Sequence, residues 1–195
     1  MSTLLGAAIH STAIVETGDI GEDSTVGPFC VIEPNVRIGR GCRIGQGCHI
    51  QEGVILSDRI QLGDGVTLWQ GVCLEEGVFV GPHAVFTHVL NPRTESYPPE
   101  IDQILQTKVG RGASIGANAT LLCGHIIGPY AVIGAGATVT HSVRAHEVVL
   151  GNPARHQGWV CECGEPLFDI RLCTRCSRSY EMIDTGLRPV GHTEE

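Results

Sequence analysis

An apolar residue recurs at every sixth position over more than seventy residues of this chain. Stepping by six from Ile14 to Phe86 meets thirteen apolar residues and no polar one. The residue that follows is often glycine, and the residue four positions later is small or β-branched. A period of six fits neither a helix of 3.6 residues per turn nor a simple alternating strand. It is typical of short flat strands that are separated by corners.

Three such strands and three corners close a triangular coil of 18 residues, in which each aliphatic side chain points inward and stacks on its equivalent one coil away. We therefore predict an all-β fold, a parallel β-helix shaped as a triangular prism. The composition agrees, because a narrow prism needs many glycines, here 26, and has little room for aromatics, here 5%. Cys30, Cys42 and Cys48 occupy small inward positions and are interpreted as core residues.

The period stops after Phe86 and restarts at Val109, which is not a whole number of repeats away. It then continues through Ile115, Leu121, Ile127, Ile133 and Val139, with small residues at Ala113, Ala119, Ala131, Ala137 and Val143. The intervening "LNPRTESYPPEIDQILQ" has a Pro-Pro pair, several charges and no period. We predict that residues 89–107 leave the prism as an exposed loop, and loops of this length in compact domains are usually functional or disordered.

Length and charge limit the possible partners. At 195 residues the chain favours one main domain with a small appendage, and we assign 1–158 to the prism and 159–195 to a C-terminal tail. The net charge of −8 argues against nucleic acid or an anionic membrane as a main partner. The N-terminal "MSTLLGAAIHSTAIVE" lacks the features of a signal peptide or a membrane span, so we expect a cytoplasmic protein with reduced cysteines.

Four cysteines in the tail form a separate pattern, Cys161-x-Cys163 followed by Cys173-x-x-Cys176. Four thiolates at this spacing suit a tetrahedral structural zinc ion, so we predict a small zinc knuckle over 161–180. A tail of free thiols or a redox pair is the alternative. Trp159 and Tyr180 are expected to pack this knuckle against the prism.

The repeats in "SIGANATLLCGHIIGPYAVIGAGATVT", followed by "GNPAR", resemble those of the left-handed β-helix acyltransferases, the hexapeptide-repeat family. A narrower resemblance rests on "FTHVLNPR", "GASIGANATLLCGHIIG" and "GNPARHQGWVCECGEPL". These segments look like bacterial N-acetyltransferases that modify a UDP-linked 2-acetamido-3-amino-2,3-dideoxyglucuronate in lipopolysaccharide and other surface polysaccharide synthesis. The resemblance implies a homotrimer in which acetyl-CoA, the cosubstrate, lies in a groove between neighbouring prisms.

The same resemblance assigns cofactor-binding positions. It implies that the backbones of Ala117 and Ala135 face the pantetheine arm and thioester, and that Arg155 meets the phosphates of coenzyme A. Thr140 falls where relatives have "TKD"; this chain has Thr140-His141-Ser142, so a lysine contact to the cofactor is absent. The alternatives are that the two alanines only fill corners and that Arg155 is a solvated surface residue.

His88, just before the loop, is the candidate general base, because an ordinary imidazole pKa near 6.5 suits proton acceptance at neutral pH. Many nucleotide-sugar relatives have asparagine here, so positioning of the substrate is the other interpretation. Asn91 and Arg93 match the "NPR" of the family, and Arg93 suits a sugar carboxylate or diphosphate.

Two other histidines are not expected to take part in catalysis. His125 stands at a small inward position and is predicted to be a hydrogen-bonded core residue. His83 and His88 have the spacing of paired metal ligands in β-helix carbonic anhydrases of the gamma type. The positions expected for a third histidine hold Gly47 and Glu52, which argues against a metal there.

Three functions remain open at this point. The leading one is an acetyl-CoA-dependent N-acetyltransferase acting on a UDP-linked amino sugar. An O-acetyltransferase acting on a sugar or another small hydroxyl acceptor is the second. A non-catalytic β-helix scaffold is the third, because a fold does not fix a function.

Overall fold

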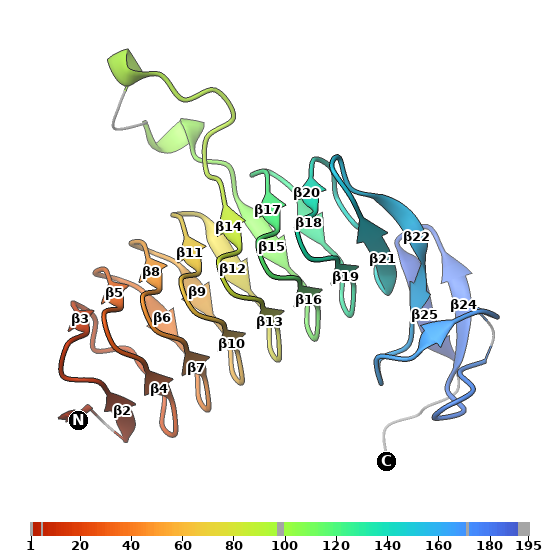
Figure 1. Cartoon of the computed structure of the whole chain (residues 1–195), viewed down its shortest axis with the longest axis horizontal. Helices are drawn as coiled ribbons and strands as arrows, with labels where there is room; N and C mark the ends of the chain where they lie inside the picture. Colours follow the sequence, from red (N-terminus) through yellow and green to blue (C-terminus); the bar gives the residue numbers. More distant parts are fainter. Residues whose placement is uncertain (1, 5, 97–99, 171, 191–195) are drawn as a thin grey trace.

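A computed structural model describes residues 2–4, 6–96, 100–170 and 172–190 of the chain. It shows a long prism of stacked coils with the N-terminus at one end (Figure 1). One loop projects from the middle of the prism, and a small β-rich unit lies at the opposite end (Figure 1). This is the predicted all-β architecture of a left-handed β-helix with an inserted loop and a C-terminal unit.

Three sheets form the faces of the prism, and we call them sheets A, B and C. In sheet A, eight strands run parallel along the prism: β2 (Ala7–Ile9), β4 (Thr25–Val26), β7 (Arg43–Ile44), β10 (Gln61–Leu62), β13 (Phe79–Val80), β16 (Ser114–Ile115), β19 (Val132–Ile133) and β21 (Glu147–Leu150). Antiparallel strands extend it at both ends: β1 (Ser2–Leu4) pairs with β2, and β22 (Arg155–Val160) and β23 (Pro166–Leu167) follow β21.

The other two faces are parallel throughout. Sheet B contains β3 (Ile14–Val15), β5 (Val31–Ile32), β8 (His49–Ile50), β11 (Thr67–Leu68), β14 (Val85–Phe86), β17 (Thr120–Leu121) and β20 (Thr138–Val139). Sheet C contains β6 (Arg37–Ile38), β9 (Ile55–Leu56), β12 (Val72–Leu74), β15 (Thr107–Val109) and β18 (Ile126–Ile127). The chain visits A, then B, then C in each coil, so equivalent residues pair in register along each face.

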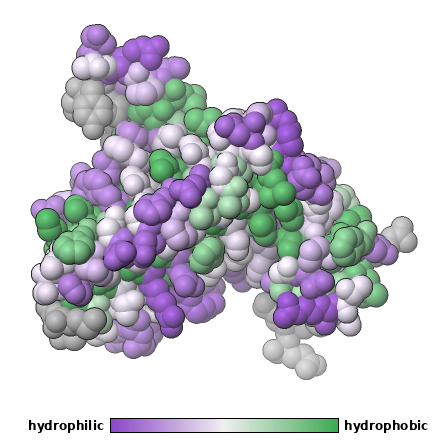
Figure 2. Space-filling model, in the orientation of Figure 1, coloured by the Kyte–Doolittle hydropathy of each residue, from purple (hydrophilic) through white to green (hydrophobic). Residues whose placement is uncertain are grey.

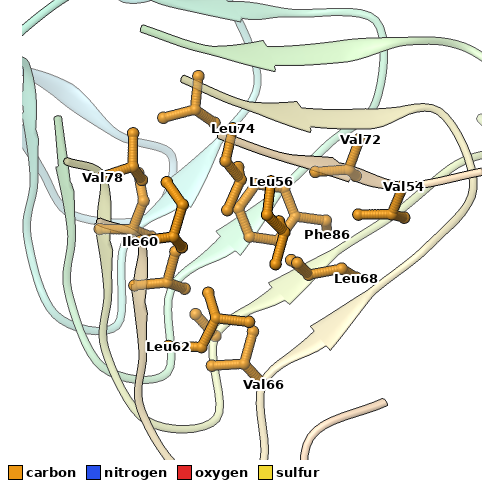
Figure 3. Packing of buried hydrophobic residues seen from close by; sticks show 14 of the residues in the cluster. Val54, Leu56, Ile60, Leu62, Val66, Leu68, Val72, Leu74, Val78 and Phe86 are labelled. Carbon is orange, nitrogen blue, oxygen red and sulfur yellow. The ribbon is translucent and has the colours of Figure 1, made fainter. Parts of the chain in front are cut away.

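The core is a set of columns of aliphatic side chains inside the prism. Val54, Leu56, Leu68, Val72 and Phe86 converge on the interior from all sides (Figure 3). The second residue of each two-residue strand of the prism points inward and is buried, except in β3, whereas the first is more exposed. Burial of aliphatic carbon, at about 25 cal/mol per Å² of apolar surface, is thus spread evenly over the coils.

The predicted period is confirmed after its first step. Every sixth residue from Ile20 to Phe86 is buried, as are the restarted series from Val109 to Val139 and the three core cysteines. The prediction was wrong for Ile14, which is 58% exposed. In β3 the inward residue is Val15, which pairs with Ile32 of β5. The first turn is therefore one residue out of phase with the rest of the repeat.

Glycine at the corners allows neighbouring coils to approach closely. A methyl group on Gly81 would lie 2.5 Å from the backbone nitrogen of Ala117 in the next coil. Other corner glycines have positive φ instead; Gly47, at φ 65°, is one of them. Both uses depend on the missing side chain of glycine, which permits close backbone approach and positive φ.

The inserted loop occupies the connection between β14, which ends at Phe86, and β15, which begins at Thr107. It contains two short 3₁₀ turns, η1 (Thr94–Ser96) and η2 (Ile101–Gln103). The Leu105 N–H donates to the His88 carbonyl at 2.9 Å and closes the base of the loop. Figure 2 shows the loop standing clear of the prism, with hydrophilic residues at its tip.

The C-terminal unit combines β22 and β23 with a hairpin of β24 (Ser179–Ile183) and β25 (Gly186–Val190). The hairpin turn is tied to the last coil, because Ala145 donates to the Thr185 carbonyl and accepts from the Leu187 N–H. A second contact runs through rings: His146 of the last coil stacks on Tyr130 and meets Tyr180 edge-on. Within the described part of the chain, no helix is long and apolar enough to span a membrane.

Candidate active site

The corners of the prism line up as three edges, and two of them carry the predicted site residues. We call the corners between sheets A and B edge AB, and the corners between sheets B and C edge BC. Ala117 and Ala135 lie on edge AB, whereas His88 and Thr140 lie on edge BC. The predicted residues therefore fall into two groups on opposite borders of sheet B.

His88 on edge BC is stacked against Trp69 of the preceding coil. The two rings are 4.5 Å apart between centroids and within 2° of parallel. His88 is half-buried, and this burial lowers its imidazole pKa below the ordinary value of 6.5. At neutral pH the ring is therefore mostly neutral and able to accept a proton.

The backbone around His88 is held by neighbouring coils. The Thr87 hydroxyl oxygen accepts from the Cys123 N–H at 3.0 Å, and the His88 carbonyl accepts from Leu105. The strand β14 that leads into this corner ends at Phe86, which is fully buried. His88 is thus carried by a rigid part of the prism although it borders the loop.

Asn91 and Arg93 lie on the outgoing leg of the loop and are exposed. Asn91 lines a small cavity of about 210 Å³ inside the loop, together with Val89, Leu90, Asp102, Gln103 and Leu105. The Arg93 guanidinium donates to the Pro92 carbonyl at 2.8 Å. The loop thus presents an amide and a guanidinium beyond the corner that holds His88.

Edge AB brings together the predicted cofactor-binding alanines and Arg155. Ala117 and Ala135 are one coil apart, because β16 and β19 pair in register. The segment before Arg155 runs beside the last coil, where Thr138 donates to Gly151 and accepts from Ala154. Arg155 itself is exposed and follows directly, so one edge carries exposed backbone corners that lead toward a guanidinium.

Thr140 does not join that group, because it follows β20 and lies on edge BC, three coils beyond Trp69. Its hydroxyl lies 3.5 Å from Nδ1 of His141. The prediction that His125 is a hydrogen-bonded core residue was wrong. His125 is half-buried, and Cys123 is the buried side chain of that corner. Burial and the neighbouring His141 both lower the pKa of His125.

The four tail cysteines come together at the far end of the prism. The sulfur atoms of Cys161, Cys163, Cys173 and Cys176 all lie within 4.8 Å of one another. Two sulfur pairs are 3.4 and 3.7 Å apart, close to the ~3.8 Å edge of a tetrahedron with Zn–S bonds of about 2.3 Å.

Neighbouring donors point at the same sulfurs. The Tyr180 hydroxyl lies 3.0 Å from the Cys161 sulfur, and the Arg178 guanidinium donates to the Cys176 sulfur at 3.7 Å. The backbone N–H of Arg178 holds the pKa of the Cys176 thiol down to about 6, which favours a thiolate. The donor set, the sulfur geometry and the surrounding donors fit a structural zinc ion.

A cavity of about 600 Å³ lies elsewhere. It opens between the last coils and the C-terminal hairpin, with Ile126, Tyr130, Arg144 and Leu187 among its walls. None of the predicted catalytic, substrate-binding or cofactor-binding residues lines it. Its size alone therefore gives no reason to move the candidate site.

Trp69 is the site residue that sequence reasoning missed. It lies at a corner, directly after the inward residue Leu68, where most repeats have a small or polar residue. An indole at such a corner, in a chain with only two tryptophans, was the available signal. Its ring partner could not be inferred, because His88 is nineteen residues away and reaches it only after one full coil.

Comparison with known proteins finds the same repeat and the same fold elsewhere. The family model "Bacterial transferase hexapeptide (six repeats)" matches residues 19–52 and 106–141. A dTDP-3-amino-3,6-dideoxy-alpha-D-galactopyranose 3-N-acetyltransferase from Aneurinibacillus thermoaerophilus is 42% identical over 81 residues, 40% of this chain and 42% of that protein. The chain thus matches less than half the length of this curated relative.

Two solved structures have the same fold. A proposed acetyltransferase from Bacillus cereus aligns with a TM-score of 0.53 and 21% identity, covering 80% of this chain and 78% of that one. A point mutant of AntD, an N-acyltransferase from Bacillus cereus in complex with dTDP and coenzyme A, also aligns with a TM-score of 0.53, at 15% identity over 78% of this chain and 80% of that one. At these identities the likeness concerns the fold.

Proposed function

We propose that this chain, a hexapeptide-repeat protein with a left-handed β-helix, is an acetyl-CoA-dependent N-acetyltransferase. Its acceptor is an amine on a nucleotide-linked amino sugar. The observation that carries the proposal is the 42% identity to an N-acetyltransferase for a nucleotide-linked 3-amino sugar. The neutral, half-buried His88 beside the loop supplies the chemistry that such a transfer needs.

The proposed reaction joins a free amine to a thioester carbonyl. The amine nitrogen attacks the acetyl carbon, a C–N bond forms, and the carbonyl oxygen takes up negative charge. Collapse of this intermediate breaks the C–S bond and releases the thiolate of coenzyme A. His88 takes the proton that the nitrogen loses and passes it to the leaving sulfur, so proton and charge balance at the end of the cycle.

Edge AB would hold the cosubstrate. Backbone N–H groups at the corners of Ala117 and Ala135 can donate to the thioester oxygen without obstruction by large side chains. Arg155, farther along the same edge, suits the phosphates of coenzyme A. Thr140 lies on the other edge, so its contact to a cofactor would come from a different direction.

The acceptor would bind at the loop on edge BC. Asn91 and Arg93 extend beyond His88, and a guanidinium there suits either a uronate carboxylate or a diphosphate. A UDP-linked 3-amino uronate contains both of these groups. The dTDP sugar of the relative lacks the carboxylate. A preference for the uronate that depends on Arg93 would therefore distinguish the two substrate classes.

The two edges would meet in a homotrimer. The outward residues of sheet B are Ile14, Val31, His49, Thr67, Val85, Thr120 and Thr138, and none is a lysine, arginine or carboxylate. Sheets A and C carry Arg43, Arg37 and Lys108 at the equivalent positions. With sheet B turned to a threefold axis, edge AB of one prism lies against edge BC of the next, which joins the cosubstrate and acceptor groups.

We also propose that Cys161, Cys163, Cys173 and Cys176 hold a structural zinc ion. When bound, the ion would cross-link the C-terminal unit in place of a large hydrophobic core. A cytoplasmic location fits the proposed transferase, because acetyl-CoA is available there. It also fits the nine cysteines, all of which are free thiols. Nucleic acid and membranes are not proposed as partners.

The test is a thiol-release assay with acetyl-CoA and a panel of acceptors. The panel contains UDP-3-amino uronate, the dTDP-3-amino-3,6-dideoxy sugar, other UDP-amino sugars, and matched hydroxyl sugars. Turnover confined to the amines supports the proposal, and a preference for the uronate that Arg93→Ala removes supports the UDP uronate class. Turnover on hydroxyl sugars alone favours the O-acetyltransferase, and no binding of coenzyme A by calorimetry favours the scaffold.

A further inference from the structure

The parallel stack of the Trp69 and His88 rings is not needed to hold the backbone of either corner, because other contacts of the prism already do so. Both residues follow strands whose inward neighbours, Leu68 and Phe86, are fully buried. The backbones of the two corners are fixed separately: Val72 donates to the Trp69 carbonyl at 3.3 Å, and Leu105 donates to the His88 carbonyl at 2.9 Å. The stack therefore adds little to the position of either backbone.

What the stack does fix is the plane of the imidazole. β11 and β14 pair in register with Thr67 opposite Val85, so Trp69 lies opposite Thr87 and one residue short of His88. This offset lets the indole cover a face of the imidazole at 4.5 Å. Within the described residues, no hydrogen bond reaches a ring nitrogen of His88, so the stack is the contact that limits rotation of the ring.

The surroundings of His88 are otherwise uncharged. The neighbouring corners present Trp69, Gln70, Cys123 and His125, and the returning leg of the loop presents Leu105. Burial lowers the pKa of His125 as well, which favours its neutral form. Arg93, Glu95, Glu100 and Asp102 are the charged groups of the adjoining loop, and burial rather than any of these charges lowers the pKa of His88. An aromatic face is a weak attractor of a charged imidazole, but it also keeps water from that side of the ring.

We propose that Trp69 is the positioning residue of this site, which holds His88 in the orientation and the neutral state needed to receive a proton from the acceptor amine. This inference rests on the proposed transferase function. It concerns a residue that acts through His88 rather than through contact with the substrate. Proton transfer depends steeply on the direction of the accepting lone pair, so a freely rotating imidazole would lower the rate of the chemical step.

The stack is tested first without any assay of activity. Because the chain has only two tryptophans, Trp159→Phe leaves Trp69 as the sole indole emitter. A protonated imidazole stacked on an indole quenches its fluorescence. We expect emission to fall as the pH is lowered through the His88 titration, and to stay flat when His88→Gln is added; emission that is flat in both variants overturns the proposal.

Side-chain NMR and kinetics then test the role. We expect the His88 ring to titrate below pH 6.5 in the wild type and in Trp69→Phe, which keeps a stacked ring, and nearer 6.5 in Trp69→Leu. Turnover in Trp69→Leu should fall on the order of tenfold with KM for acetyl-CoA little changed, and Trp69→Phe should keep most of it. Equal losses in the two variants with unchanged titration would make Trp69 a packing residue and overturn the proposal.

The two proposals fail in different ways. If no acceptor is acetylated by any variant, the transferase function is wrong, whereas fluorescence and NMR still decide whether Trp69 orients His88. If the wild type is active and the Trp69 variants titrate and turn over like it, only the positioning role is wrong. Circular dichroism of each variant checks the fold, and the fluorescence arm leaves Trp69 itself unchanged.

Discussion

A single methyl group is large compared with the space between corners of neighbouring coils. At Gly81 it would lie 2.5 Å from the Ala117 nitrogen, whereas at Gly18 no atom lies within 4 Å. The corner of Ala117 on edge AB is thus positioned by the absence of a side chain one coil earlier. Residues that bear no functional group therefore shape the candidate cosubstrate site.

Gly81→Ala is predicted to destabilise the protein by ~1–3 kcal/mol, because the coils must separate or the backbone must bend to admit the methyl group. It should also weaken binding of coenzyme A through the displaced Ala117 corner. Gly18→Ala is the matched control and should change the free energy of unfolding by no more than about 0.5 kcal/mol. Denaturant melts and calorimetry with coenzyme A measure both; equal stabilities would show that the corner can relax.

His88→Ala is predicted to lower kcat by a factor of ~10² to 10⁴, the usual range for loss of a general base. The pH profile gives an independent check. Only the neutral imidazole accepts a proton, and burial lowers its pKa, so kcat/KM of the wild type should rise with pH through an inflection below 6.5 and then level off. A near-normal kcat in His88→Ala at about pH 7 to 8 would leave the substrate amine to lose its proton to water or to the thiolate.

At the scale of the strand, the sequence is a nearly complete guide. Two-residue strands with one inward side chain follow directly from a period of six, and burial from Ile20 onward agrees. The failures occur where the repeat meets something else. Ile14 lies in the first, incomplete coil, and at the corner of His125 the buried place is taken by Cys123.

Phe86→Ala should be among the most destabilising changes in the prism, at ~3–5 kcal/mol, because the largest fully buried side chain would leave a cavity in the last strand before the loop. Phe168→Ala provides the contrast, since that ring is 94% exposed and should change stability by less than about 0.5 kcal/mol. Thermal and denaturant unfolding compare them. A small effect of Phe86→Ala would mean that the neighbouring columns close the cavity.

The C-terminal unit depends on a different source of stability. Its buried cluster contains few apolar residues beside the cysteines, namely Leu167, Tyr180 and Leu187. Metal analysis is predicted to find about one zinc ion per chain, and a strong chelator should unfold this unit before the prism melts. Cys163→Ser should lose the metal, whereas Cys73→Ser, outside the cluster, should keep it; zinc-free protein with an intact unit would contradict the assignment.

For the whole molecule, the sequence identifies the candidate residues but does not say which of them meet. His88 and Arg155 each lie within a recognisable motif. They nevertheless lie on opposite borders of sheet B, because their corners belong to different edges of the prism. No pattern along one chain encodes a contact between two copies. The same holds for Trp69 and His88, whose contact appears only once the coils are stacked.

Co-expression of two inactive variants decides whether the edges meet across subunits. His88→Ala removes the base from edge BC, and Arg155→Ala removes the guanidinium from edge AB. If each site takes His88 from one subunit and Arg155 from the next, random mixing of the two variants in a trimer restores both residues in about a quarter of the sites. Each purified mixed trimer then contains one restored site in three, so we expect turnover near a third of the wild-type value, measured with the two variants carrying different tags so that mixed trimers can be purified.

The matched control is the double variant, which should stay inactive when it is mixed with either single variant, since none of the sites then contains both residues. Thr67→Arg on the face of sheet B should disperse the trimer in light scattering and abolish turnover, because it brings three charges together at the axis, whereas Gln61→Arg on sheet A should do neither. Recovery of no activity in mixed trimers, with each variant correctly assembled, would place His88 and Arg155 within one subunit or remove one of them from the site. Recovery near the expected fraction would assign every site to a pair of neighbouring prisms, which is the arrangement that an uncharged face between two functional edges favours.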